Sequence, residues 1–266
     1  MVAVFEAAHG RSKASGRIAV VLATAALSAL LTLSGDVALA QTPAATALPT
    51  GAQVVAGAAT LQQAGAQLTV QQASDKLITN WQSFNIGANA TVRFVQPGAA
   101  SVALNRVLSN DPSAIYGTLQ SNGQVFLVNP SGVLFGASAR VDVGGLVASS
   151  LQLADADFLA GRYRFGGPAT SGAVGNEGRI SAAQGGTLAF IAPRVHNSGS
   201  LSAPQGSVAL GAGEQVSMDF AGDKLLRFSV DQGTVDALVD NQGLIQASGG
   251  SVVLSARAAD AVTRGL

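Results

Sequence analysis

Three copies of one short pattern decide the fold, namely Asn176–Ala182 (NEGRISA), Asn197–Ala203 (NSGSLSA) and Asn241–Ala247 (NQGLIQA). Each copy reads Asn-x-Gly-x-(Ile/Leu)-x-Ala, and a second short apolar run follows about ten residues after its Asn. The first two copies start 21 residues apart and the last two start 44 apart, which is close to twice that spacing. A weaker copy, Asp231–Ala237, lies outside this phase. Such a regular repeat is typical of a solenoid built from stacked coils.

The composition of the chain fits a parallel β-helix. Short runs with period-two alternation recur between Gly, Asn and Pro, whereas long amphipathic helical patterns are nearly absent. Coils of such a helix stack about 4.8 Å apart, so about ten coils would form a rod of roughly 50 Å. We therefore predict an all-β, single-stranded parallel β-helix. A β-sandwich or barrel, whose turns are less regularly spaced, is the alternative.

The repeated Asn and Gly have a physical role at the corners of this helix. Both residue types tolerate the left-handed conformation that turns one face into the next, and aligned Asn side chains can form amide ladders. The expected corner residues are Asn176, Gly178, Asn197, Gly199, Asn241 and Gly243.

Several segments depart from the coil pattern. Residues 111–117 predict a turn with a short helical piece, and residues 154–160 predict one helical turn that projects from the rod. Residues 218–230 alternate around Gly222–Asp223 and predict a hairpin outside the helix, where the repeat spacing doubles. Residues 51–70 could cover the N-terminal strand edges, which otherwise invite aggregation. The C-terminal end has no comparable device, so we expect either a truncated product or the first part of a longer protein.

The first forty residues predict a cleaved secretory signal. Arg11, Lys13 and Arg17 form a basic n-region, residues 18–33 form a short apolar h-region, and Ala38 and Ala40 supply the small-x-small cleavage site. A transmembrane anchor is disfavoured because the apolar run is shorter than the roughly 20 residues that a bilayer requires. The long n-region suggests a specialised export route. Residues 41–266 would then form one domain.

The charged and reactive residues argue against catalysis and nucleic-acid binding. The chain has 15 basic and 15 acidic residues and no basic run, and it lacks cysteine. Asp155 and Asp157 are the only close acidic pair before the last third, and a solvated-loop role is expected for them. His196 has no partners for a metal or nucleophile site, and Gly211-x-Gly213 lacks the third glycine of a dinucleotide loop. We expect no enzyme activity, no cofactor and no metal.

The stretch Gly123–Gly136 (GQVFLVNPSGVLFG) places two strand-like runs around the polar residues Asn129 to Gly132. In isolation it has the pattern of a hairpin. The 21-residue period indicates instead that the two runs are successive faces of one coil, joined at a tight corner. Pro130 would fix φ in the turn, and Gly132 would allow a positive φ.

Three segments together resemble a known family: Asn80–Gly87 (NWQSFNIG), Val102–Val107 (VALNRV) and Gly123–Gly136. They are similar to the N-terminal secretion domain of two-partner secretion exoproteins, the filamentous haemagglutinin family with haemagglutination activity, and particularly to its high-molecular-weight adhesin branch. The similarity covers about residues 48–150, and the repeats at 170–257 are compatible with it. The resemblance implies a right-handed parallel β-helix at the surface of a Gram-negative bacterium.

The resemblance also implies a secretion route and partners. The chain would enter the periplasm through the general secretion machinery, and an outer-membrane β-barrel transporter with periplasmic POTRA modules would carry it outward. The expected function is a secreted adhesin-like exoprotein whose N-terminal domain directs its own export, with a host-cell or carbohydrate receptor and no nucleic-acid partner. The alternative is a self-contained carbohydrate-binding or carbohydrate-active β-helix protein.

The family's Asn-Pro-Asn-Gly-Ile/Val secretion motif maps onto Asn129, Pro130, Ser131, Gly132 and Val133, with Ser131 in place of Asn. Serine keeps turn propensity and a hydrogen-bonding oxygen, so we expect the motif to function. A second family motif, Asn-Pro-Asn-Leu, is missing, because residues 109–112 read Ser-Asn-Asp-Pro.

Other residues in the matching segments have two readings each. Asn85 and Asn105 are expected to belong to the secretion motif or to transporter recognition. Trp81 and Phe84 fit the core better than a sugar-binding platform. Arg93 and Arg106 could contact the transporter, but isolated charges on strands more often only solubilise.

Overall fold

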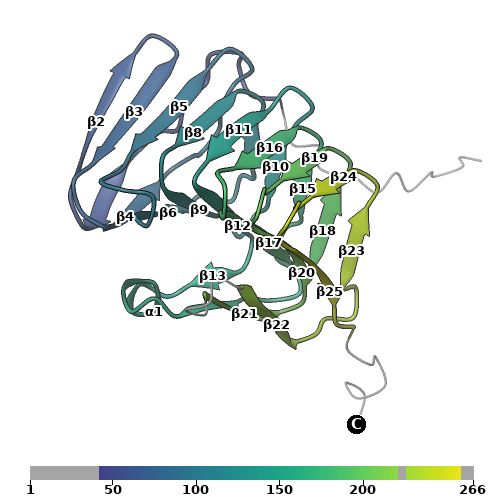
Figure 1. The fold of residues 1–266 in the computed structure, drawn as a ribbon. Coiled ribbons are helices and arrows are strands. Elements are labelled where there is room, and N and C mark those ends of the chain that lie inside the picture. The colour runs from purple at the N-terminus through teal and green to yellow at the C-terminus, as the bar shows by residue number, and fades with distance from the viewer. Residues whose placement is uncertain (1–41, 221–225, 259–266) are drawn as a thin grey trace, which may run out of the picture. The chain divides into compact units, whose positions relative to one another are not determined.

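Three sheets made of one strand per coil run through residues 42–220 and 226–258, the residues that the computed structural model describes (Figure 1). Neighbours in the first sheet are far apart in sequence, as where Leu188 pairs with Val208 in parallel register. The strands of the first sheet, in spatial order, are β1 (Gln53–Ala56), β4 (Lys76–Trp81), β6 (Val102–Val107), β9 (Gln124–Val128), β12 (Gly145–Ser149), β17 (Thr187–Ala192), β20 (Ser207–Ala212) and β25 (Ser251–Ala256).

The second sheet repeats this arrangement, and the third is shorter because the earliest coils contribute no named strand to it. The second sheet consists of β2 (Ala59–Ala64), β3 (Gln67–Gln72), β5 (Thr91–Val95), β8 (Thr118–Ser121), β11 (Arg140–Val143), β16 (Arg179–Ala182), β19 (Ser200–Ser202) and β24 (Leu244–Gln246). The third consists of β23 (Leu238–Asn241), β18 (Arg194–Asn197), β15 (Val174–Asn176), β10 (Val133–Phe135) and β7 (Ser113–Ile115). Their parallel registers confirm the β-helix and exclude the sandwich or barrel.

The interior of the helix is filled by alternate residues of each strand. In β11, for example, Val141 is buried whereas Arg140, the residue before it, is exposed. Phe135 and Phe190 approach one another across the interior, with nearly parallel rings whose centroids lie 5.8 Å apart. Because every inward position stacks on its equivalent in the next coil, this core continues from one end of the helix to the other.

The N-terminal end of the helix is covered by antiparallel strands. β1 pairs antiparallel with β4, and β2 forms a hairpin with β3, so both cap strands extend existing sheets with reversed direction. The expected cap at residues 51–70 is therefore present. The first sheet is left with seven parallel strands rather than the ten coils expected, because the cap and the excursions described next consume part of the chain.

A fourth, antiparallel sheet lies outside the helix, against the outer face of the first sheet. It includes β21 and β22, the hairpin expected near residues 218–230, whose turn residues 221–225 lie outside the described part of the chain. The predicted helical turn is also present, as α1 (Asp155–Leu159). The strands of this outer sheet are β13 (Gln152–Leu153), β14 (Tyr163–Gly166), β21 (Gln215–Phe220) and β22 (Leu226–Gln232).

The hairpin explains the doubled repeat spacing. Asn197 and Asn241 are direct partners in adjacent strands of the third sheet although 44 residues separate them, since β21 and β22 leave the helix between them. The expectation for residues 111–117 was wrong. Ser113–Ile115 is strand β7, which pairs in parallel with β10 and leaves no helical turn there.

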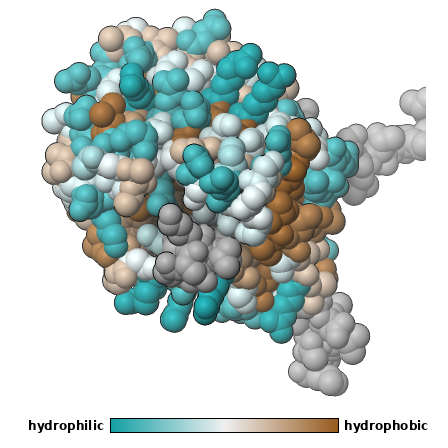
Figure 2. Space-filling view, viewed as in Figure 1, coloured by the Kyte–Doolittle hydropathy of each residue, from teal (hydrophilic) through white to brown (hydrophobic). Residues whose placement is uncertain are grey.

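The C-terminal coil leaves the core open in the described residues. Val252 and Leu254 continue the inward rows of Val208 and Leu210, yet they are about half exposed. Figure 2 shows an apolar band on the side where β23 and β24 end the helix, and Leu238 and Leu244 are exposed in these two strands. Among the described residues, no helix has the length and hydropathy needed to cross a membrane.

Candidate functional site

The segment that joins β9 to β10 is a corner, because β9 belongs to the first sheet and β10 to the third. Asn129 is the first corner residue, and every polar atom of its side chain is used. Its Oδ1 accepts a hydrogen bond from the Ser131 N–H at 2.9 Å, and its Nδ2 donates to the carbonyl of Asp111 at 2.9 Å and to Ser113 Oγ at 3.0 Å. A side-chain oxygen bonded two residues ahead is an Asx turn. The amide thus shapes its own corner and ties it to the preceding coil.

The rest of the corner is a tight turn. The Gly132 N–H donates to the carbonyl of Asn129 at 2.9 Å, and Gly132 has a φ of 110°. L-residues rarely adopt this conformation, and a Cβ at this position would also lie 2.7 Å from the carbonyl oxygen of Ala173. Glycine is therefore required at position 132 for two separate reasons.

The following coil lies directly on the corner. The Gly172 N–H donates to the carbonyl of Pro130 at 2.8 Å, and the Val133 N–H donates to the carbonyl of Ala173 at 3.1 Å. A Cβ on Gly172 would overlap the main chain of Ser131, so the approach depends on glycine there as well. In consequence Asn129 is 0% exposed, and its amide is inaccessible to another molecule in the folded domain.

Ser131 contributes to the corner through its main chain. Its N–H bonds to Asn129, and within the described residues no hydrogen bond engages its hydroxyl, which belongs to a half-buried side chain. In this chain the side chain at position 131 therefore makes no hydrogen bond that shapes the corner.

Asn85 and Asn105, the other two expected motif residues, lie in different places. Asn85 Oδ1 accepts the Ala114 N–H at 2.8 Å, so Asn85 and Asn129 hold strand β7 from the coils before and after it. Asn105 is buried inside the first sheet, where its Oδ1 accepts the Trp81 Nε1–H at 3.0 Å. The structure thus brings Asn85 and Asn129 to the same region and places Asn105 in the core.

The repeated Asn residues form an amide ladder along the third sheet. Asn176 Nδ2 donates to Asn197 Oδ1 at 2.8 Å, and Asn197 Nδ2 donates to Asn241 Oδ1 at 2.7 Å. The glycines two residues further on stack so closely that a Cβ on Gly199 would overlap the carbonyl of Gly178. The same holds for Gly243 against Gly199. The expected left-handed conformation is wrong at these corners, because none of the repeat Asn and Gly residues has a positive φ. The glycines are needed for space, since they let successive coils stack at strand distance.

A second amide network was missed by the sequence analysis. Gln96 donates to Gln72 Oε1 at 3.1 Å, accepts from Ser121, and exchanges two main-chain bonds of 2.8 Å with the Asn122 side chain. These residues end β3, β5 and β8, at the corner between the second and first sheets. Gln72, Gln96 and Asn122 are 24 and 26 residues apart, which differs from the 21-residue repeat further along the chain. An amide side chain after each alternating run was nevertheless a signal from which this network could have been predicted.

The aromatic residues of the first matching segment belong to the core. Trp81 and Phe84 are each 1% exposed and meet edge to face at 5.4 Å, which confirms the core reading. Arg93 is exposed on β5. Arg106 is not an isolated charge, since its Nη2 lies 2.6 Å from Asp155 Oδ1 and also donates to the carbonyl of Leu153 at 2.7 Å.

The polar residues considered for catalysis are in separate pairs. Asp157 pairs with Arg162, at 2.7 Å, rather than sharing a site with Asp155. His196 Nδ1 lies 3.0 Å from Asp240 Oδ2 on the outer face of the third sheet. Ala38 and Ala40, the expected cleavage residues, lie outside the described part of the chain.

The chain is thus a capped parallel β-helix with an outer antiparallel sheet and a tight corner at residues 129–132 whose Asn129 side chain is buried. The model of the TPS secretion domain family matches residues 45–265. The chain belongs to this family, and the match is wider than the 48–150 region recognised from motifs.

Individual relatives agree with this family. A solved structure, the secretion domain of HMW1 from Haemophilus influenzae, matches 80% of this chain and 60% of its own, with 30% identity and a TM-score of 0.70. Two heme/hemopexin-binding proteins of Haemophilus influenzae are 32% and 36% identical over 219 and 137 residues. These matches cover 79% and 51% of this chain but only 24% and 14% of the relatives' lengths.

Proposed function

We propose that this chain is the N-terminal part of a secreted, adhesin-like exoprotein and that it directs its own export through a dedicated outer-membrane β-barrel transporter. The family match over residues 45–265 carries the proposal. It favours export over a self-contained carbohydrate-binding or carbohydrate-active protein. The predicted signal at residues 1–40, cleaved after Ala40, would deliver the chain to the periplasm through the general secretion machinery, and the product would reach the cell surface or the medium.

The burial of Asn129 constrains how a transporter could read the motif. In the folded domain the side-chain amide of Asn129 is hydrogen-bonded to Asp111, Ser113 and Ser131. The coil at residues 172–173 covers the corner. A partner that contacts this side chain must therefore meet the chain before that coil docks. We propose that POTRA modules of the transporter bind residues around 80–135 as an extended chain, by β-augmentation.

Folding outside the cell would then favour outward movement. Each emerging coil adds a strand to the open edge of its sheet and buries inward residues on those of the previous coil, as Val252 and Leu254 do on Val208 and Leu210. This process requires no nucleotide, cofactor or catalytic group, and we propose no enzymatic activity. The names of the relatives mention heme and hemopexin binding. Because these relatives are about four to seven times as long as the matched segments, we do not extend that binding to this chain.

Co-expression tests the proposal. The chain is produced with and without a candidate transporter, and the chain released to the medium is measured. Export should depend on the transporter, and release that is equal in its absence would refute the proposal.

Two matched variants test the role of the motif. Asn129→Ala removes the corner amide, and Asn197→Ala removes a ladder amide that is equally buried but lies outside the motif. If Asn129 is read by the transporter, Asn129→Ala should reduce export far more than Asn197→Ala at similar loss of stability. Equal reductions would show that the motif acts only through folding.

A further inference from the structure

The corner that joins β8 to β9 contains the one Asn-Gly sequence of the chain, Asn122–Gly123. Asparagine is chemically labile, and its side chain reacts most readily before glycine, because glycine has no side chain to hinder attack by its main-chain nitrogen and rotates freely. Such a sequence on a strand-rich scaffold is a liability unless the structure requires both residues. At this corner it does.

Asparagine is required at position 122 because its side chain joins two coils. Asn122 Oδ1 accepts the Gln96 N–H at 2.8 Å, and Asn122 Nδ2 donates to the carbonyl of Gln96 at 2.8 Å. These two bonds tie the end of β8 to the end of β5 in the preceding coil. A carboxylate at this position could not replace them, because it has no hydrogen to donate to the carbonyl.

Glycine is required at position 123 because the neighbouring coils leave no room for a side chain. A Cβ there would lie 2.6 Å from Gln96 Oε1 and 2.7 Å from the carbonyl oxygen of Ser101. On the other side, a Cβ on Gly144 would lie 2.6 Å from the carbonyl oxygen of Gly123. The labile sequence is therefore imposed by close contacts with the coils before and after it.

The same contacts restrain the two groups that would react. The amide of Asn122 is held at both of its polar atoms by Gln96. The Gly123 N–H donates to Ser121 Oγ at 3.1 Å, and the Gly123 carbonyl accepts the Gly145 N–H at 3.3 Å. Attack of the Gly123 nitrogen on the Asn122 side chain requires both residues to rotate, so these bonds must first break.

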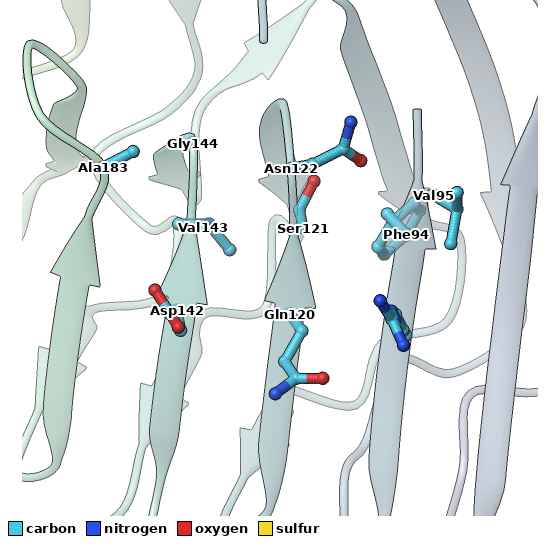
Figure 3. A pocket seen from close by; sticks show the side chains of 10 residues that line it. Phe94, Val95, Gln120, Ser121, Asn122, Asp142, Val143, Gly144 and Ala183 are labelled. Atoms are coloured by element: carbon cyan, nitrogen blue, oxygen red, sulfur yellow. The ribbon is translucent and has the colours of Figure 1, made fainter. Parts of the chain in front are cut away.

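Protection at this corner comes from restraint and not from exclusion of water. Asn122 is exposed, and with Ser121 and Gly144 it lines an open hollow of about 360 Å³ on the outer face of the second sheet. Figure 3 shows Ser121 and Asn122 at the end of their strand, between Val95 and Gly144 of the neighbouring coils. Water thus has access to the side chain in the folded domain, and the fold controls only whether the first step can occur.

We infer that Asn122–Gly123 is a deamidation site that is closed in the folded domain and open in the unfolded chain. In the unfolded chain the Gly123 nitrogen attacks Cγ of Asn122, a new C–N bond forms, and the Cγ–Nδ2 bond breaks. The Nδ2 group leaves as ammonia and carries away the proton of the Gly123 N–H. Water then opens the succinimide at either carbonyl and leaves an aspartyl or an isoaspartyl residue. This inference is independent of the export proposal.

Neither product can rebuild the corner. The aspartyl product places a negative carboxylate against the Gln96 carbonyl in place of the lost hydrogen bond. The isoaspartyl product adds one carbon to the main chain directly before β9, whose Val125 faces the interior core and whose Phe126 faces the outer one. A change in chain length there disturbs the placement of both faces. The reaction therefore converts reversible unfolding into irreversible loss of the folded domain.

Peptide mass spectrometry of the purified mature chain tests the site. The chain is incubated in mildly alkaline buffer, with and without enough urea to unfold it, and the replacement of NH2 by OH at position 122 is followed by mass. Deamidation of Asn122 should be at least about tenfold faster in urea, because the native chain reacts only while it is open. Asn89, which is exposed and precedes alanine, is the internal control and should react slowly in both samples. Equal rates at Asn122 in both samples, or no reaction in urea, would refute the inference.

A variant opens the restraint in the folded domain. Ser121→Ala removes the oxygen that holds the Gly123 N–H and should raise the native deamidation rate of Asn122 at least about threefold, with Asn89 unchanged. Ser138→Ala, which removes a hydroxyl bonded to a carbonyl in another corner, is the matched control and should leave the rate unaltered. An unchanged rate in Ser121→Ala, or an equal rise at Asn89, would overturn the local restraint.

Refolding tests the consequence for the domain. Chain aged in urea is diluted into buffer, and folded monomer is separated from unfolded and aggregated chain by size-exclusion chromatography. The products at position 122 should be at least about fivefold depleted in the folded monomer, because the bonds to Gln96 cannot form. Asn122→Asp isolates the effect of the charge and should unfold at a lower urea concentration than the native chain. Equal distribution of the products, or an unchanged urea midpoint, would contradict the inference.

Discussion

The side-chain nitrogen of Asn197 lies 2.7 Å from the side-chain oxygen of Asn241, although 44 residues separate them in sequence. Asn197 also accepts from Asn176 on its other side, so it is the middle member of the ladder. A buried Asn held by both neighbours loses more on truncation than a terminal one, because each abandoned partner is left unsatisfied.

Truncating the ladder should therefore have graded effects. Asn197→Ala should lower the free energy of unfolding by about 2–4 kcal/mol, because one buried and one partly buried hydrogen bond are lost. Asn241→Ala, at the exposed end, should lower it by about 1 kcal/mol or less. Urea unfolding of the purified mature chain measures both. Equal losses for the two variants would contradict the ladder as a source of stability.

Substitutions at the corner, at Asn129 and Ser131, should also change the free energy of unfolding by different amounts. Asn129→Ala should cost about 2–4 kcal/mol, because the Ser131 N–H and the Asp111 carbonyl lose their partner in a buried site. Ser131→Asn, which restores the family's residue, should change stability by less than about 0.5 kcal/mol, since Ser131 acts through its main chain. The same urea series measures both, and a large gain from Ser131→Asn would show that a side-chain contact at this corner has been overlooked.

Gly132 should tolerate alanine less well than another glycine of positive φ. Gly132→Ala combines backbone strain with the approach to Ala173, whereas Gly65→Ala, at a φ of 55° in the β2–β3 turn, meets no atom within 4 Å. We expect a loss of about 1 kcal/mol at Gly65, the cost of strain alone, and at least about twice that at Gly132. Thermal unfolding compares them, and similar losses would mean that the Ala173 coil yields easily.

The ion pair of Arg106 should hold the outer excursion in place. Arg106 binds Asp155 and the Leu153 carbonyl, and Lys76 Nζ donates to the carbonyl of Leu159 at 2.6 Å. Arg106→Met should raise the rate of limited proteolysis within residues 154–166 at least about threefold, because local opening becomes cheaper. Arg93→Met, on an exposed strand position, is the control. Uniform cleavage throughout the chain would indicate global unfolding instead.

Tyr163 should make the domain sensitive to alkaline pH. Burial raises the pKa of Tyr163 above its ordinary value of 10.0. The folded state therefore favours the neutral phenol, and this contribution to stability is complete below pH 10 and declines as the pH rises through the folded-state pKa. Unfolding curves from pH 8 upward should fall more steeply for the native chain than for Tyr163→Phe. Parallel curves would assign the alkaline loss to other groups.

The sequence predicted the β-helix because its repeat is self-consistent. Asn176, Asn197 and Asn241 mark the same corner, at spacings of 21 and 44 residues, which are about one and two repeat lengths. It predicted the hairpin of β21 and β22 from alternation. It did not predict that β13 and β14 join that hairpin. Tyr163 and Met218 are strand partners although 55 residues separate them in sequence, and no local pattern indicates this pairing. Nor did it predict β7, because Ser113–Ile115 is held by Asn85 and Asn129, which are remote in sequence.

The outer sheet also buries the opposite face of the first sheet. Phe126 of β9 meets Phe158 at 5.9 Å and Tyr163 at 5.0 Å, so strands of the solenoid have a second apolar core on their outer side. The short runs read as alternating are thus apolar on both faces here, which explains why β9 and β12 have almost no exposed positions. The period-two alternation in the sequence could not show whether the outer face of the first sheet is exposed to solvent or covered by another sheet.

The pairing of β14 with β21 has a consequence for cooperativity. In a simple solenoid each coil contacts only its neighbours, so the ends can fray one coil at a time. Here residues 163–166 are fastened to residues 215–218, and the coils formed by residues 174–212 lie between the two fastened segments in sequence. Fraying that reaches those coils from either end is therefore expected to require opening of the outer sheet. Residues 163–218 are therefore expected to open as one unit rather than by the stepwise loss of single coils.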